Sequence, residues 1–208
     1  MSIWAIVPVK PLRRGKSRLA PVLSEDDRAA LNERMLIHTI DTLKSVPELG
    51  EVLVVSRDPA ALAIAREHGA RTLQEDGAPH LNVALTRATA VAQTYTATSV
   101  LVVPADLPQL SPADLSAMLQ AGKEGPAVVI APDHHHEGTN ALYVNPVGLV
   151  QYQFGEGSFQ AHSAAAATAG ARLHVLELLS LSHDVDVPED LDFLQLSDVN
   201  KGATNEVV

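Results

Sequence analysis

The chain has 208 residues and 46% of them are hydrophobic, so it can bury a sizeable core and is expected to form one domain. Its formal net charge of −10 argues against a nucleic-acid-binding surface. No apolar run approaches the roughly 20 residues that span a bilayer, and Met1-Ser2-Ile3-Trp4 lacks the basic start of a signal peptide. The absence of cysteine excludes disulfides, thiolate metal sites and a cysteine nucleophile, and we expect a cytoplasmic protein.

A buried strand is predicted at residues 3–9, and a basic loop follows it. Five of the 15 Lys and Arg residues lie between Lys10 and Leu19. Such clusters are usually solvated, but this one stands between a strand and a helix, where cations and backbone N–H groups bind phosphates. It is not a P-loop, because Lys10 stands where that motif needs its first glycine. We therefore expect Lys16 and Arg18 to hold a triphosphate as much through side chains as through the backbone.

The next elements alternate between helices and strands. A helix opens at Asp26, and it is followed by a strand at 52–56, a helix at 59–68, a strand at 71–73 and a helix from 81 to about 95. This order predicts a parallel sheet with right-handed crossovers. Asn82 lies in the first turn of the last helix, where it is either a polar group of the helix start or a contact to a nucleobase or ribose.

The apolar run at 100–103 predicts a strand covered on both faces, and Asp106 lies just beyond its end. Ligands of open parallel sheets bind outside the carboxyl ends of the strands, so a carboxylate between Pro104 and Pro108 is well placed to hold a cation. The alternative is turn chemistry, because a helix begins soon afterwards at Ser111-Pro112.

The second half adds a helix at 112–122, a strand at 127–131 and a strand at 138–144 that is predicted to be antiparallel or at an edge. The loop from His134 to His136 is interpreted as solvated, because consecutive loop residues cannot all face one ion. The turn Gly155-Glu156-Gly157-Ser158 opens a further helix. Its free N–H groups and the Ser158 hydroxyl predict an anion pocket, a plain helix cap, or both.

Carboxylates return near the end of the chain, after a strand at 173–176. Asp184 and Asp186 alternate with Val185 in an extended segment, and we expect both to reach one face only if the backbone turns. Asp186 also suits a helix start together with Pro188. Residues 1–196 are assigned to one domain, and residues 197–208 are predicted to form a mobile tail because they carry no packing pattern.

Taken in order, these motifs resemble those of one family. They are Pro8-Val9-Lys10 with Lys16-Ser17-Arg18-Leu19, Leu81-Asn82-x-Ala84-Leu85, Pro104-Ala105-Asp106-Leu107-Pro108, Gly138-Thr139-Asn140, Gly155-x-Gly157-Ser158-Phe159 with His162, and Asp184-x-Asp186-x-Pro188-Glu189-Asp190-Leu191. Up to about Leu194 the chain closely resembles the phospholactate and phosphoenolpyruvate guanylyltransferases of coenzyme F420 biosynthesis. It resembles the molybdenum-cofactor nucleotidyltransferases more distantly, because their first loop is richer in glycine.

The resemblance implies a three-layer α/β/α, GT-A-like nucleotidyltransferase with a mostly parallel mixed sheet. It implies that GTP and Mg²⁺ are used to guanylylate a three-carbon phospho-acid with release of pyrophosphate. By motif, the nucleotide site comprises Pro8, Lys10, Lys16, Arg18, Gly77 and Asn82, and the catalytic residues are Lys16, Arg18 and Asp106. The metal ligands implied are Asp106, Asp184 and Asp186, and the acceptor site comprises Thr139, Asn140, Gly155 and Ser158.

Other functions stay open on the sequence alone. A molybdenum-cofactor or sugar-phosphate nucleotidyltransferase, or a non-catalytic nucleotide-binding subunit, is an alternative reading of the same motifs. The sequence does not decide which phospho-acid is the acceptor, and the base preference follows only from the resemblance. The oligomeric state is open too, although the apolar helix surface at Ala164 to Ala167 could pair subunits in a homodimer.

Overall fold

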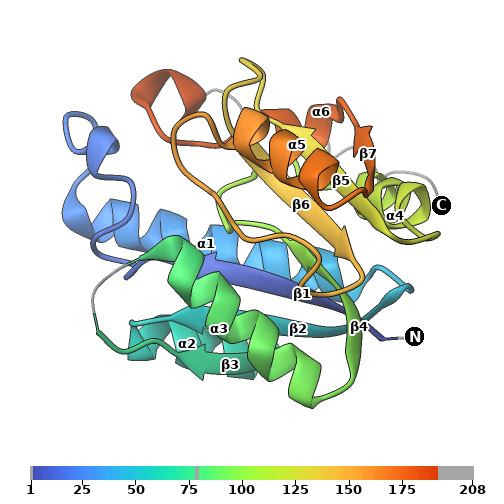
Figure 1. Cartoon of the computed structure of the whole chain (residues 1–208). Helices are drawn as coiled ribbons and strands as arrows, with labels where there is room; N and C mark the ends of the chain where they lie inside the picture. Colours follow the sequence, from blue (N-terminus) through green and yellow to red (C-terminus); the bar gives the residue numbers. More distant parts are fainter. Residues whose placement is uncertain (1, 78–79, 192–208) are drawn as a thin grey trace, which may run out of the picture.

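The computed structural model describes residues 2–77 and 80–191, which form a three-layer α/β/α domain (Figure 1). The strands are β1 Ser2–Val9, β2 Leu49–Ser56, β3 Arg71–Gln74, β4 Ala97–Val102, β5 Ala127–Pro132, β6 Thr139–Asn145 and β7 Arg172–Val175. The helices are α1 Glu25–Lys44, α2 Pro59–Glu67, α3 Leu81–Thr94, α4 Pro112–Ala121, α5 Ser158–Thr168 and α6 Leu179–Ser182, with 3₁₀ turns at Ser17–Leu19 and Pro188–Asp190.

The strands form one sheet in the order β3-β2-β1-β4-β6-β5-β7. β1, β2, β3 and β4 are parallel, β6 is antiparallel to both of its neighbours, and β7 is parallel to β5. The predicted mostly parallel mixed sheet is therefore confirmed. The strand at 138–144 was expected to be antiparallel or at an edge, and β6 is antiparallel in the interior of the sheet.

Alternating strand residues divide the core between the two faces of the sheet. Ala5 and Val7 of β1 face a cluster that also contains the apolar residues of α1, α2 and α4. Trp4 and Ile6 face the opposite cluster, which α3 and α5 complete. Figure 1 shows α3 and α5 together on one side of the sheet. Both faces are thus covered, which explains why the strands are continuously apolar.

Helices α1 and α2 begin where the sequence supplies side-chain caps. The Ser24 hydroxyl accepts a hydrogen bond from the Asp27 N–H at 3.1 Å at the start of α1. Asp58 caps α2 in the same way, and Pro59 occupies the first helical position. No described helix has both the length and the apolar character needed to cross a membrane.

The strand order changes direction at β1, which is the topological switch point of the sheet. The chain adds β2 and β3 on one side of β1 and then returns to place β4 on the other side, which creates a crevice at the carboxyl ends of β1 and β4. Because β6 runs the opposite way, its first residues reach the same edge. The predicted elements are confirmed to within a few residues, whereas the domain boundary at 196 and the tail at 197–208 lie outside the described residues.

Candidate active site

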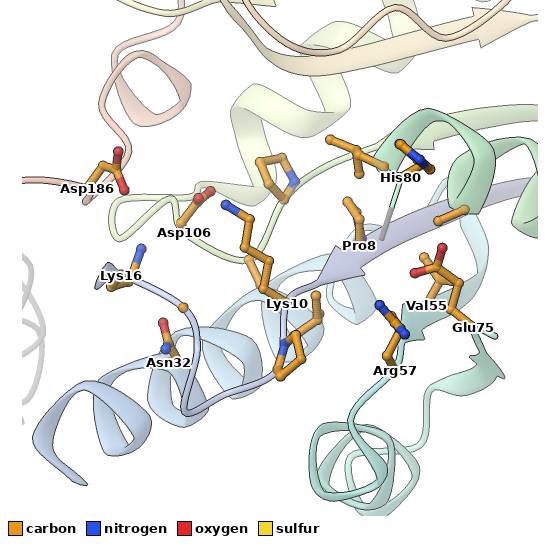
Figure 2. Close-up of a pocket in the computed structure, with 17 residues that line it drawn as sticks. Pro8, Lys10, Lys16, Asn32, Val55, Arg57, Glu75, His80, Asp106 and Asp186 are labelled. Carbon is orange, nitrogen blue, oxygen red and sulfur yellow. The ribbon is translucent and has the colours of Figure 1, made fainter. Parts of the chain in front are cut away.

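Two cavities meet at Asp106 on the crevice edge. The first, here called the Lys10 pocket, has a volume of about 340 Å³ and is shown in Figure 2. The second, called the Thr139 pocket, has a volume of about 490 Å³. Asp106 and Asp186 line both cavities, although 80 residues of chain separate them. The convergence predicted from the sequence is therefore present.

Asp106 follows the end of β4, as predicted, and its half-buried side chain lies between the two pockets, with its Oδ1 atom buried. Its Oδ1 atom has no hydrogen-bond partner among the described residues. Burial raises the pKa of Asp106 above its ordinary value, Lys16 and Lys10 oppose this rise, and Asp184 and Asp186 add to it. A buried carboxylate oxygen without a partner is costly for the protein alone, so this atom is available to a cationic ligand.

The basic loop is held in place by a side chain of α1 and by the side chain that caps α2. Asp58 accepts the Leu12 N–H at 2.8 Å, and Asn32 donates to the Leu12 carbonyl at 2.6 Å. Gly15 allows α1 to approach closely, because a Cβ atom there would lie 2.6 Å from the Asn32 amide nitrogen. Lys16 then adopts a left-handed conformation with φ of 54°, which is uncommon for a non-glycine residue and often accompanies a functional site.

Lys16 joins this loop to the carboxylates near the end of the chain. Its Nζ donates to the Val185 carbonyl at 2.5 Å, and the Val185 N–H donates to the Asp106 carbonyl at 3.0 Å. The Val185 side chain is buried in a small cluster with Leu19 and Met35. These contacts hold the segment that carries Asp184 and Asp186 against the crevice.

Asp184 and Asp186 both line the Thr139 pocket without a turn between them. The expectation that a turn was needed was wrong, because residues two positions apart in an extended segment point to the same side. Asp186 also forms an ion pair with Arg18 at 2.6 Å between Nη1 and Oδ2. The Asp190 carboxylate accepts the N–H groups of Asp186 and Val187, each at 2.8 Å, and so starts the following 3₁₀ turn.

The residues present fit a divalent cation at Asp106. In residues 2–77 and 80–191 no three His, Cys, Asp or Glu side chains are arranged as a complete metal site. However, Mg²⁺ is usually held by one or two carboxylates together with substrate phosphates and water, so a complete protein cage is not required. The unpartnered Asp106 Oδ1 supplies a hard oxygen ligand, and Asp184 and Asp186 stand close enough to influence its pKa.

The Thr139 pocket is built around hydrogen bonds between its own walls. The Thr139 N–H donates to the Ser158 hydroxyl at 3.0 Å, and the Thr139 hydroxyl lies 3.0 Å from His162 Nδ1. His162 Nε2 accepts the Gln153 N–H at 3.0 Å. Nδ1 therefore carries the proton and donates to Thr139. Burial lowers the pKa of His162 to about 4, which keeps the ring neutral.

The chain matches the family model described as "Guanylyl transferase CofC like" over residues 3–206. The chain belongs to this guanylyltransferase family. It is 45% identical over 197 residues to the phosphoenolpyruvate guanylyltransferase of Rubrobacter xylanophilus, with 95% of each chain covered. It is 38% identical over 196 residues to the phosphoenolpyruvate guanylyltransferase of Conexibacter woesei, with 94% of this chain and 88% of the relative covered. The family resemblance stated from the motifs is confirmed.

Solved structures show the same fold. A putative nucleotide-diphospho-sugar transferase from Desulfovibrio desulfuricans superposes with a TM-score of 0.79 at 15% identity, covering 99% of this chain and 91% of that one. A nucleotidyl transferase of a Methanothermobacter species superposes with a TM-score of 0.70 at 18% identity, covering 97% and 99%. The family membership and this shared fold establish the chain as a nucleotidyltransferase enzyme, as predicted.

Several residues that the family motifs marked have other partners in the structure. The Asn82 amide donates to the Phe154 carbonyl at 3.1 Å, and its oxygen accepts the Phe154 N–H at 2.8 Å. Asn82 thus connects α3 to the Gly155 turn, and neither pocket includes it among its lining residues. Gly77 has φ of 90° and is also not among the lining residues of either pocket, whereas Pro8 lines both.

The expected anion pocket at the start of α5 is largely filled by the protein itself. The Ser158 N–H donates to the Gly155 carbonyl and the Phe159 N–H to the Glu137 carbonyl. Ser158 is not the cap, because Gly157 takes that position with φ of 68°. Ser158 instead supports Thr139, while Asn140 donates to the Leu181 carbonyl at 2.8 Å. The expectation of free N–H groups was wrong for these two positions, although Gly155 and Ser158 do line the Thr139 pocket.

The His134 to His136 loop is supported by local contacts rather than by a metal site. The His134 ring stacks on His183, and His136 packs edge-on against Phe159. The neighbouring Asp133 accepts three backbone N–H groups of this loop at 2.9 to 3.1 Å. Asp133 lines the Thr139 pocket, so these contacts hold the loop at one edge of that pocket.

Sequence reasoning assigned no role to Glu75 and Arg57, which line the Lys10 pocket. Each follows the end of a parallel strand, β3 and β2 respectively, at the edge where Asp106 lies. Their position directly after a strand was the signal by which the sequence could have identified them. The same principle identified Asp106 but was not applied to these two residues.

Proposed function

We propose that this protein transfers GMP from GTP to the phosphate of a three-carbon phospho-acid, such as 2-phospho-L-lactate or phosphoenolpyruvate, and releases pyrophosphate. The observation that carries the proposal is the meeting of two cavities at one buried carboxylate, Asp106. One cavity carries the cationic loop, and the other is lined by the residues that the family motifs assign to an acceptor. The relatives named above as phosphoenolpyruvate guanylyltransferases support guanylyl transfer to such an acceptor. A place in coenzyme F420 biosynthesis is part of the proposal and follows only from the family resemblance of the motifs.

In this proposal the nucleotide lies in the Lys10 pocket with its phosphates beside Asp106. Lys10 and Lys16 line that cavity, and Figure 2 shows Lys16 near Asp106 and Asp186. Attack on the α-phosphate places charge on its equatorial oxygens and on the leaving pyrophosphate. The two ammonium groups stabilise this charge, and the left-handed backbone of Lys16 fixes where its side chain starts.

The acceptor lies in the Thr139 pocket in this proposal. Its phosphate monoester is largely dianionic at neutral pH, because the second pKa is about 6, so it can attack without a general base. No histidine is among the described residues that line this pocket. His162 lies behind Thr139, where its neutral ring orients the hydroxyl, so its role here is to position a donor.

An anionic acceptor needs positive charge in this cavity. Arg18 is the cation among the described lining residues of the Thr139 pocket, and it is paired with Asp186. Asp106 and Asp184 leave the pocket acidic, which would repel a phospho-acid. Bound Mg²⁺ would supply the missing charge and would orient the triphosphate. Asp106, with Asp184 and Asp186, would hold it.

The test is a pyrophosphate-release screen of GTP, ATP, CTP and UTP against phospholactate, phosphoenolpyruvate and phosphoglycerate in the presence of Mg²⁺. Mass spectrometry of the products identifies the linkage. The proposal predicts release that requires both GTP and one of these acceptors. Absence of release with GTP and every acceptor would contradict it, and a product formed from CTP, ATP or UTP in place of GTP would replace it with another nucleotidyl transfer.

We further propose that the enzyme acts in the cytoplasm, and its pairing into a homodimer stays a prediction. Ala166 is buried against the core, whereas Ala164 and Ala167 are exposed on α5. Light scattering of the purified chain would determine the oligomeric state.

A further inference from the structure

The Lys10 pocket has a third carboxylate, Glu75, which lies away from Asp106 and Asp186 (Figure 2). Glu75 follows β3, and its backbone N–H donates to the Ser56 carbonyl at 2.9 Å, which fixes where the side chain begins. Its Oε1 atom is buried and has no hydrogen-bond partner among the described residues. Within this part of the chain, Glu75 and Asp106 are the carboxylates with such an atom, and both line the Lys10 pocket.

The two carboxylates lie at opposite ends of the cavity. Figure 2 shows Asp106 and Asp186 on one side of Lys10 and shows Glu75 on the other side, beside Arg57 and Val55. With the triphosphate beside Asp106, the Glu75 end receives the nucleobase. Pro8 and Val55 provide apolar surface there for a flat ring (Figure 2).

Arg57 completes this end of the pocket with donors. It follows β2, and no hydrogen bond or ion pair of its guanidinium is found in the described residues. A carboxylate accepts hydrogen bonds only, and a guanidinium donates only. The base that fits must therefore present adjacent donors to Glu75 and acceptors to Arg57.

Guanine is the base that meets this requirement. Its N1–H and 2-amino groups are adjacent donors, and its O6 and N7 atoms are acceptors of the kind that arginine recognises. Adenine, cytosine and uracil each place an acceptor next to their single donor group on the pairing edge, so one carboxylate oxygen would face a lone pair. We propose that Glu75 binds N1–H and the 2-amino group of guanine and that Arg57 binds its acceptor edge. This inference rests on the proposed function and assigns the base specificity of the same site.

The test compares GTP with ITP, whose base lacks only the 2-amino group, and with ATP. Binding of each nucleotide in the presence of Mg²⁺ is measured by calorimetry for the wild type, Glu75→Gln and Asp76→Asn. The last variant makes the same change of charge at the adjacent exposed residue, which lines neither pocket. Thermal melting of each variant checks folding, and Glu75→Asp replaces Glu75→Gln if the latter does not fold.

We expect the wild type to bind GTP about tenfold or more tightly than ITP, because a hydrogen bond to a charged group is lost. In Glu75→Gln, GTP affinity falls about 10- to 100-fold and the difference between GTP and ITP disappears. In Asp76→Asn both affinities stay as in the wild type. In Glu75→Asp the carboxylate is withdrawn by one methylene, so the preference for GTP weakens but persists.

Two results would overturn the inference. One is a wild type that binds GTP, ITP and ATP with equal affinity or binds none of them. The other is a folded Glu75→Gln variant that keeps the full preference for GTP over ITP. The pyrophosphate assay on the wild type is judged separately, so turnover with GTP combined with either result leaves the proposed function standing while the role of Glu75 fails.

Discussion

The two pockets that meet at Asp106 differ in what their polar groups already contact. Asp106, whose Oδ1 is buried without a protein partner, lines both pockets, and the Lys10 pocket adds Glu75, whose Oε1 is in the same state. In the Thr139 pocket, the side chains of Thr139, Asn140 and Ser158 are all hydrogen-bonded to neighbouring protein groups. Apart from the shared Asp106, the Lys10 pocket therefore has an unsatisfied charge at Glu75, whereas the Thr139 pocket has walls whose side chains bond one another.

This difference predicts whether a substitution changes turnover, folding stability or both. An unsatisfied buried charge costs stability in the absence of ligand, so its removal should affect turnover and leave the fold intact. A hydrogen-bonded wall contributes to folding as well as to binding, so its disruption should affect both. The predictions below use this contrast.

Asp106→Asn should have the largest effect. Turnover should fall about a thousandfold or more, because the proposed function places this charged group at the reacting centre. The melting temperature should stay the same or rise, since the buried charge has no hydrogen-bond partner at Oδ1. Pyrophosphate release and thermal melting measure the two effects. A folded variant with near-normal activity would refute the metal role of Asp106.

Lys16→Ala should lower the rate about a hundredfold while changing acceptor affinity much less. The lysine lines the Lys10 pocket, and its Nζ also bonds the Val185 carbonyl. Arg14→Ala removes a cation from the same loop at an exposed position outside both pockets and is the matched control. Calorimetric titration of the acceptor beside the rate measurement would expose the opposite pattern, in which acceptor affinity falls more than the rate.

Folding stability should depend on pH through His162. Its pKa is lowered by burial to about 4 in the folded chain, from about 6.5 when unfolded, so the unfolded state binds the proton more readily. The contribution of His162 to the free energy of unfolding is therefore fully present above about pH 6.5. It falls as the pH drops toward 4, by at most about 1.4 kcal/mol per pH unit. Urea unfolding measures this slope in the wild type and in His162→Gln. An unchanged slope in the variant would exclude His162 as its source.

Asn82→Ala should have the smallest effect and separates the two readings of this residue. Loss of the paired hydrogen bonds to Phe154 should cost about 1 to 2 kcal/mol of unfolding free energy and should raise the KM for the acceptor more than that for GTP. Thr86→Ala, which removes an exposed hydroxyl from the next turn of α3, is the control. An increase confined to the KM for GTP would instead support a nucleoside contact.

The sequence predicted the element order and the edge at which the site lies, because apolar periodicity and strand ends are local signals. It also predicted that Lys16, Asp106 and Asp186 converge. Lys16 and Asp106 follow parallel strands, which end at one edge of the sheet, and Asp186 was added by its match to the family motif. The sequence did not predict the hydrogen-bond partners of the site residues. Whether the Asn82 amide meets a ligand or the Phe154 backbone depends on contacts between segments 72 residues apart.

The missed residues have the same explanation. Glu75 stands in a polar loop where a solvated side chain is the ordinary expectation, and only the packed structure reveals that one of its oxygens is buried. His162 appeared in the sequence as part of a family motif without an assigned role. Its contacts to Thr139 and Gln153 come from two separate segments.

The central claim is that a nucleotide and a phospho-acid meet at Asp106 for transfer of a guanylyl group. The most direct measurement follows GTP labelled at the α-phosphorus in the presence of phosphoenolpyruvate or phospholactate, with the wild type and with Asp106→Asn. The account predicts that the label appears in a guanylylated phospho-acid with the wild type, and that almost none appears with the folded variant. Label that stays in GTP with the wild type, or equal transfer by both proteins, would contradict it.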